Sequence, residues 1–196
     1  MNEKNPPLSE TFQQALNFAA ELHRGQIRKN NQIPYLSHLL GVTSLVLECG
    51  GTESEAAAAL LHDAVEDQGG RETLLEIQHR FGEEIAAIVE GCTDAYTIPK
   101  PPWRARKEKY LHSLGSASPS VRLVSLADKV HNARSLHRDL LTCGESIWSE
   151  FKGGKEGTLW YYQSLTEILN TGNCPYLERE LGRYVSWITE LTEQRS

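Results

Sequence analysis

The apolar residues of this 196-residue chain recur with the period of an α-helix along almost its whole length. Ser9 has the character of a helix N-cap, and apolar residues follow it at spacings of three and four positions. Nowhere do apolar and polar residues alternate as they do in a half-buried strand. The pattern therefore predicts an all-α fold of one domain, with a core over about 9–140 and C-terminal helices over about 145–194 packed on it. The same spacing predicts further helices near 36–47, 52–69, 71–80, 83–92, 103–114, 118–140, 158–170 and 177–191.

Glycine and proline mark where these helices begin and end. Paired glycines close two of the predicted helices, because glycine readily adopts the backbone conformation of a helix C-terminus. Three prolines exclude a helix over 94–102. Ser118 and Pro119 match the N-cap and first position of a long helix. Three glycines over 153–157 predict a loop before the helix near 158.

Composition argues against several classes of protein. Apolar residues make up 39% and charged residues 23% of the chain, which is ordinary for a folded globular protein. The formal net charge of −6 argues against binding to a nucleic acid polymer or an acidic membrane. The N-terminus has no charged-then-apolar signal pattern, and no run of about 18 apolar residues predicts a membrane span. We therefore expect a cytoplasmic protein without a membrane partner.

The cysteines are far apart in the sequence and form no CxxC pattern. In a reducing cytoplasm such residues are expected to be free thiols. This expectation covers Cys49, Cys92, Cys143 and Cys174.

The segment HDAVED at 62–67 is the most specific feature of the sequence. His62 and Glu66 are four residues apart, as are Asp63 and Asp67, so on a continuous helix over about 52–69 each pair shares a face. Four titratable groups would then lie on one side of a helix whose other positions are Ala, Leu and Val. Of only five aspartates in a chain with 21 glutamates, two are in this segment. The less specific interpretation is a solvated polar face at a helix end.

Two residues elsewhere add to this set. Asp128 lies midway along an otherwise apolar predicted helix, where an unpaired carboxylate would be costly to bury. It is therefore expected to pair with a cation, either a basic neighbour such as Lys129 or a metal ion. His38 alone predicts no more than a hydrogen-bonded histidine. Together with His62 and Asp63, however, these residues form a set of two imidazoles and two carboxylates, which suits Mn²⁺, Fe²⁺ or Zn²⁺.

The order of these motifs resembles that of the HD-domain metal phosphohydrolases. His38 comes first, HDAVED at 62–67 second, and LADKVHN at 126–132 third. Within that superfamily the chain is similar to the hydrolase domain of the RelA/SpoT alarmone enzymes. It resembles most of all the stand-alone small alarmone hydrolases of the metazoan SpoT-homologue type. The resemblance extends over about 12–137 and includes the flanking segments RFGEEIAAIVEGCTD and VRLVSLADKVHNARSL.

The resemblance implies a compact HD-domain helical bundle that hydrolyses the 3′-pyrophosphate of (p)ppGpp, giving GDP or GTP and pyrophosphate. It implies that four side chains hold one Mn²⁺ and that two acids orient or deprotonate the attacking water. It also implies side chains that contact the base, sugar and phosphates of the nucleotide. The residues carried over are His38, His62, Asp63 and Asp128 for the metal, Glu66 and Asp67 for the water, and Arg28, Lys29, Asn132 and Tyr161 for the nucleotide.

A group of basic residues follows the proline-rich loop. It predicts either an exposed basic helix or a clamp for phosphate, in which Lys100 would contact the substrate. Cations of this kind, together with a metal ion, would let a chain of net charge −6 hold a polyanion. The group consists of Lys100, Arg104, Arg106, Lys107 and Lys109.

The chain departs from the family pattern at three places. Leu39 follows the first metal histidine where the family has proline, the loop 29–34 lacks the family's Ser-Gly, and FKGGKEG at 151–157 replaces a basic stretch. The last two lie where the base would be recognised, so (p)ppApp, NADPH or another nucleoside phosphate are alternative substrates. A catalytically silent nucleotide-binding regulator is a further alternative. The intact Glu66 and Asp67 disfavour it, because a sensor needs a metal and a pocket but no base.

Overall fold

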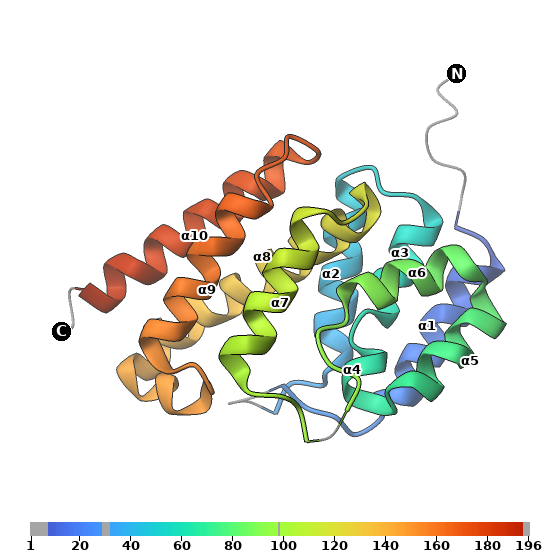
Figure 1. Ribbon diagram of the computed structural model, residues 1–196, viewed down its shortest axis with the longest axis horizontal. Helices are drawn as coiled ribbons and strands as arrows, with labels where there is room; N and C mark the ends of the chain where they lie inside the picture. The colour runs from blue at the N-terminus through green and yellow to red at the C-terminus, as the bar shows by residue number, and fades with distance from the viewer. Residues whose placement is uncertain (1–7, 29–31, 98, 194–196) are drawn as a thin grey trace.

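The structure, a computed structural model, describes residues 8–28, 32–97 and 99–193 and places most of them in helices (Figure 1). The described part of the chain contains an isolated β-bridge between Ile27 and Pro34 but no strand, so the predicted all-α class is confirmed. None of the described helices is both long and apolar enough to span a membrane. In chain order the elements are α1 (Glu10–Leu22), α2 (Leu36–Glu48), α3 (Glu53–Leu61), α4 (Ala64–Gln68), α5 (Arg71–Phe81), α6 (Glu83–Cys92), α7 (Trp103–Gly115), α8 (Pro119–Cys143), the 3₁₀ helix η1 (Gly144–Glu150), α9 (Gly154–Ile168) and α10 (Pro175–Glu193).

The long helix α8 runs through the centre of the molecule. It packs against α2, α3 and α6, which lie to its right in Figure 1, and against α10, which lies to its left. Its buried side chains extend from Val121 to Leu140 and include the carboxylate of Asp128. This central position brings Asp128 next to residues carried by α2 and α3.

Several helices begin where the sequence predicts. The Ser9 side chain accepts a hydrogen bond at the start of α1, and Ser118 does the same for α8, with Pro119 in the first helical position. At the start of α3, Thr52 and Glu55 form a capping box in which each side chain bonds the other's backbone N–H. These N-termini are set by local sequence, which is why the predicted starts agree with the structure.

The prediction of one helix over 52–69 is wrong, because the chain breaks between α3 and α4 at His62 and Asp63. The backbone at Asp63, with φ −96° and ψ −5°, departs from regular helical geometry. The break brings His62 Nε2 to 3.1 Å from Asp63 Oδ2.

The predicted loop over 153–157 is also largely helical, since α9 begins at Gly154. The glycines here serve close packing. A Cβ atom at Gly153 would lie 2.6 Å from the indole ring of Trp103, and one at Gly157 would lie 3.1 Å from the same ring. Glycine at these positions therefore lets α9 approach the start of α7.

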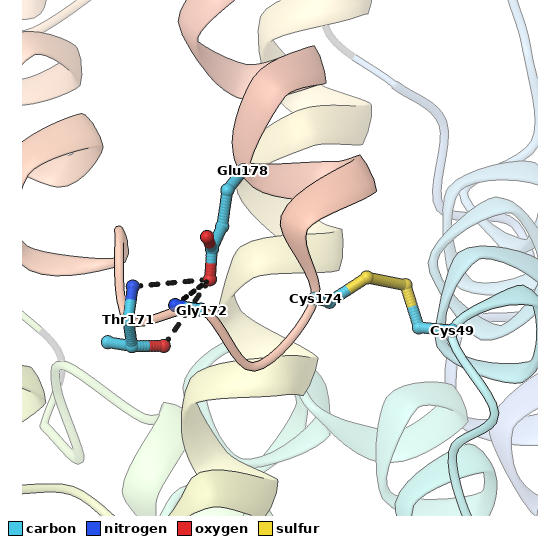
Figure 2. The surroundings of a disulfide bond; sticks show 5 residues. All are labelled: Cys49, Thr171, Gly172, Cys174 and Glu178. Carbon is cyan, nitrogen blue, oxygen red and sulfur yellow. Dashed lines mark hydrogen bonds between the residues drawn. A yellow bond between two sulfur atoms is a disulfide. The ribbon is translucent and has the colours of Figure 1, made fainter.

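The expectation of four free thiols is wrong for Cys49 and Cys174, which form a disulfide (Figure 2). Cys49 caps the C-terminus of α2, and Cys174 immediately precedes α10. Their Cα atoms are 6.2 Å apart although 125 residues separate them in the sequence. Sequence spacing cannot reveal such a pair, because both helices reach this place by packing on α8. Among the described cysteines, Cys92 and Cys143 are free.

The loop before Cys174 is held by the first turn of α10. Glu178 Oε1 accepts hydrogen bonds from the backbone N–H groups of Thr171, at 3.2 Å, and Gly172, at 2.9 Å (Figure 2). The disulfide and this carboxylate together fix the end of α10 that lies nearest to α2.

Candidate metal centre and active-site cleft

The predicted metal ligands meet at the centre of the molecule. His38 comes from the first turns of α2, His62 and Asp63 from the break between α3 and α4, and Asp128 from the middle of α8. Ligand atoms of His38, His62 and Asp128 lie within 4.8 Å of one another, and all three residues are buried. Asp63 joins them, because its Oδ2 lies 3.1 Å from His62 Nε2 and 3.4 Å from His38 Nε2. We call these four residues the metal cluster.

Both imidazoles of the metal cluster present Nε2 to its centre, 3.1–3.6 Å from carboxylate oxygens of Asp63 and Asp128. His62 Nδ1 donates to the carbonyl oxygen of Ala59 at 2.8 Å, and His38 Nδ1 lies 2.9 Å from His131 Nδ1. Within the described residues, neither buried Nε2 has a hydrogen-bond partner. Buried polar atoms are rarely left unpaired. Two such nitrogens facing two carboxylates make a donor set that a divalent cation fits.

Mutual charge sets the protonation of the metal cluster. Burial acts to lower the pKa of His62, but the charges of Asp63 and Asp128 raise it well above its ordinary value. Burial acts to raise the pKa of Asp63, but His62 and His38 hold it well below its usual range. Lys129 lowers the pKa of Asp128 in the same way, against its burial, with Nζ 2.5 Å from Oδ2. Both carboxylates are therefore ionised, and a cation entering the cluster would displace the proton of His62.

A cleft of about 610 Å³ opens over the metal cluster. Tyr35 and Asn132 connect the two, since both line the cleft and each donates a 2.5 Å hydrogen bond to a cluster carboxylate, Asp63 and Asp128 respectively. The cleft wall is positively charged although the whole chain carries −6. Its described basic side chains are Arg28, Lys100, Arg106, Lys107, Lys129, Arg138 and Lys152, and its acidic ones are Glu66, Asp67 and Asp139.

Glu66 and Asp67 lie in the short helix α4 and face the cleft. Lys100 Nζ is 2.7 Å from Glu66 Oε1 and 3.3 Å from Asp67 Oδ1. Burial raises the pKa of Glu66 to about 7, and the neighbouring charge of Asp94 contributes to the rise. Asp94 itself is buried, but Lys107 lowers its pKa to about 2. A carboxyl group with a pKa near 7 is suited to exchange protons at neutral pH.

The residues predicted to contact the nucleotide line the cleft, with one exception. Arg28 Nη2 donates to Asn132 Oδ1 at 2.9 Å, which links the loop after α1 to α8. Tyr161 comes from α9, and the Nζ of Lys107 lies 4.8 Å from the centre of its ring. Lys29 lies outside the described residues, so its contact with the nucleotide stays a prediction.

The basic group after the proline-rich loop is divided between the cleft and the surface. Lys100, Arg106 and Lys107 line the cleft, as expected of a phosphate clamp. The guanidinium of Arg104 instead lies over a tryptophan ring of α9, 3.2 Å from its centre, and Lys109 is exposed. Part of the group is therefore at the surface, and the role of its cleft-lining members as a phosphate clamp stays a prediction.

Sequence reasoning missed several residues that the structure brings to the site. Tyr35 bonds Asp63, His131 bonds His38, and Asp94 lies beside Glu66. For Asp94 the sequence held one indication of a role in the site, since it is one of only five aspartates in the chain. For Tyr35 and His131 it held none, because Tyr35 reaches Asp63 only when α2 packs against α3, and His131 reaches His38 only when α2 packs against α8.

Comparison with known proteins assigns the chain to a family. The model of the HD domain family matches residues 15–159. The chain is 41% identical over 159 residues to the Xenopus tropicalis protein named guanosine-3′,5′-bis(diphosphate) 3′-pyrophosphohydrolase MESH1, which covers 80% of this chain and 81% of that protein. The Homo sapiens protein of the same name is 39% identical over 142 residues, covering 71% of this chain and 74% of that protein.

Solved structures have the same fold. A metazoan ortholog of SpoT, described as hydrolysing ppGpp, matches with a TM-score of 0.73 and 26% identity over 96% of this chain and 97% of that one. The Listeria monocytogenes protein lmo0812 matches with a TM-score of 0.69 and 31% identity over 78% of this chain and 99% of that one. Since the family model covers well over half of its length, the chain belongs to the HD domain family.

Proposed function

We propose that this protein is a metal-dependent hydrolase that removes the 3′-pyrophosphate of (p)ppGpp-type alarmones, releasing GDP or GTP and pyrophosphate. The observation that carries the proposal is the position of the metal cluster beneath a cleft with a positively charged wall. An alarmone brings two groups of phosphates, and only compensating cations let a chain of net charge −6 hold it. The relatives named as guanosine-3′,5′-bis(diphosphate) 3′-pyrophosphohydrolases support the same substrate.

The metal ligands in this proposal are His38, His62, Asp63 and Asp128, and the metal is Mn²⁺, with Fe²⁺ or Zn²⁺ as alternatives. When bound, such a cation polarises phosphate oxygens and lowers the pKa of water. The convergence of both Nε2 atoms on the two ionised carboxylates supports these assignments. Asn132 donates to Asp128 and so orients this carboxylate before a cation binds.

Glu66 deprotonates the attacking water, and Asp67 orients it. The raised pKa of Glu66 lets it take up a proton near neutral pH. Lys100 forms ion pairs with both carboxylates and lines the cleft. Its ammonium group can therefore leave the carboxylates and bind a phosphate of the entering substrate. Because the bond from Lys100 lowers the pKa of Glu66, this transfer makes Glu66 a stronger base as the substrate arrives.

The nucleotide lies along the rest of the cleft. Arg28 and Lys29 meet the base by stacking and by charge, and Tyr161 packs beside the nucleotide. Asn132 bonds the sugar or a phosphate. The hydrogen bond between Arg28 and Asn132 supports this arrangement, because it places both groups at the same wall of the cleft.

One feature favours an alternative substrate with another base, such as (p)ppApp or NADPH. Phe151 and Lys152 belong to the segment 151–157, which departs from the family pattern, and both line the cleft. The wall near the proposed base site is therefore different in this chain from the one that the family pattern implies.

The test offers ppGpp, ppApp and NADPH in parallel to the Mn²⁺-loaded protein and identifies the products by ion-exchange chromatography. Release of pyrophosphate from ppGpp is the expected result. Orthophosphate as the sole inorganic product would identify a phosphomonoesterase instead. Binding of nucleotide without turnover would identify a silent regulator.

We also propose that the protein acts in the cytoplasm. The disulfide between Cys49 and Cys174 makes this testable, because cytosolic reductants keep most thiols reduced. Alkylating the thiols of intact cells before lysis, followed by mass spectrometry, reports the state of the pair. A largely reduced pair would support the cytoplasm, and a fully oxidised pair would contradict it.

A further inference from the structure

The two histidines of the metal cluster are held by different kinds of partner. His62 Nδ1 faces the carbonyl oxygen of Ala59, which can only accept, so Nδ1 carries a proton and Nε2 is the atom that faces the cluster. His38 Nδ1 faces the Nδ1 of His131 at 2.9 Å. An imidazole nitrogen can accept or donate, so the tautomer of His38 depends on that of His131.

His131 is held between two helices in one orientation. It lies on α8, three residues after Asp128, and is 8% exposed. Its ring centre is 4.7 Å from that of His38. The other edge of the ring lies on Gly41 of α2, where a Cβ atom would come within 2.4 Å of its Cδ2 and Nε2 atoms. The absence of a side chain at Gly41 therefore makes the space in which His131 points its Nδ1 at His38.

We propose that His131 is a positioning residue of the metal centre, whose Nδ1 accepts a hydrogen bond from the Nδ1–H group of His38, so that His38 Nε2 faces the metal with its lone pair. For His38 to bind a cation through Nε2, its proton must be on Nδ1. The facing Nδ1 of His131 must then be unprotonated, with the His131 proton on Nε2. The inference uses the metal site of the proposed function but not its substrate.

Partners that orient metal-bound histidines in this way typically change metal affinity by about 10- to 100-fold when they are removed. His131→Phe keeps a ring of similar size and removes the acceptor. His131→Asn keeps an oxygen near the position of Nδ1 and restores the acceptor. Gly41→Ala leaves every polar group in place and displaces the ring of His131. The three variants thus separate the hydrogen bond from the packing.

The experiment measures the Mn²⁺ affinity of the metal-free protein by competition with a fluorescent chelator, without nucleotide. We expect binding to be about 10- to 100-fold weaker in His131→Phe and in Gly41→Ala. In His131→Asn we expect an affinity within about threefold of the unmodified protein, since the acceptor is restored. The matched control is His137→Phe, on the same helix but packed against aromatic rings of α10, which should leave the affinity unchanged.

Two results would overturn the inference. One is an unchanged Mn²⁺ affinity in His131→Phe, and the other is an equal loss in His131→Phe and His131→Asn, which would show that only packing matters. Circular dichroism of each variant verifies that it folds, and excess Mn²⁺ should restore binding in a folded His131→Phe. If the predicted affinities are found but ppGpp is not hydrolysed, the proposed function fails while the role of His131 stands.

Discussion

The HDAVED segment combines two roles, and single substitutions should separate them. Asp63→Ala removes a carboxylate from the metal cluster, so we expect loss of both Mn²⁺ binding and hydrolysis. Glu66→Gln leaves the metal cluster complete and removes only the base. It should retain its Mn²⁺ affinity and lose about 10²- to 10⁴-fold in kcat. Calorimetric titration with Mn²⁺ and steady-state kinetics measure the two effects, and full activity in either variant would contradict the assignment.

The environment of Glu66 predicts that substitution of its neighbour Asp94 changes the pH dependence of hydrolysis. Burial and the negative charge of Asp94 raise the pKa of Glu66 to about 7. Asp94→Asn removes that charge and leaves its cationic partner Lys107 without a carboxylate, and both changes favour the ionised form of Glu66. Because the base works when ionised, the acid limb of kcat/KM should move to lower pH.

The pH profiles are compared at saturating Mn²⁺. The control is Asp139→Asn, which also removes an acid of the cleft wall but one whose side chain bonds Arg138 instead. A shift of the limb to higher pH in Asp94→Asn, or an equal shift in both variants, would refute the coupling between Asp94 and Glu66.

At the scale of elements, the start of α3 should contribute measurable stability. Thr52 and Glu55 form its capping box, and the other end of the same helix carries His62. Thr52→Ala leaves the backbone N–H group of Glu55 without its side-chain acceptor and should lower the free energy of unfolding by about 1 kcal/mol. Urea denaturation measures this loss, with the exposed Thr142→Ala in the last turn of α8 as the control. Equal stability of the two variants would argue against the capping box.

Over the whole molecule, the disulfide should stabilise the contact between the C-terminal helices and the rest of the fold. It closes a loop of 125 residues, and a cross-link of this kind stabilises by about 2–4 kcal/mol, chiefly by restricting the unfolded chain. Cys49→Ser should lower the free energy of unfolding by that amount under non-reducing conditions and by little when reductant is present. Cys143→Ser removes a free thiol and serves as the control. A deficit that persists in reductant would mean that lost packing, not the cross-link, is responsible.

We also propose that the chain forms one domain. A contiguous core supports this, because buried residues of α10 such as Leu177 and Leu181 belong to the same cluster as those of α2 and α3. If so, the loss of helical circular dichroism and the change in tryptophan fluorescence should coincide in one transition of the oxidised protein. Separate transitions would place the C-terminal helices in a second unit.

The helices and the chemical character of the site could be predicted from the sequence, because both depend on residues that are near one another in the chain. The apolar period follows from 3.6 residues per turn, and the caps at Ser9 and Ser118 bond backbone groups only a few positions away. The combination of His62, Asp63 and a buried Asp128 indicated a metal because ionised carboxylates are costly to bury without a cation.

Only the tertiary structure decided how these parts meet. The break at His62 and Asp63 accompanies the convergence of both side chains on a point between α2 and α8, which the local sequence of α3 does not reveal. The disulfide partner of Cys49, and the contact of His131 with His38, depend in the same way on which helices pack together. Packing sums weak contacts over the whole chain, so a residue's distant neighbours are a property of the fold and cannot be read from its own segment.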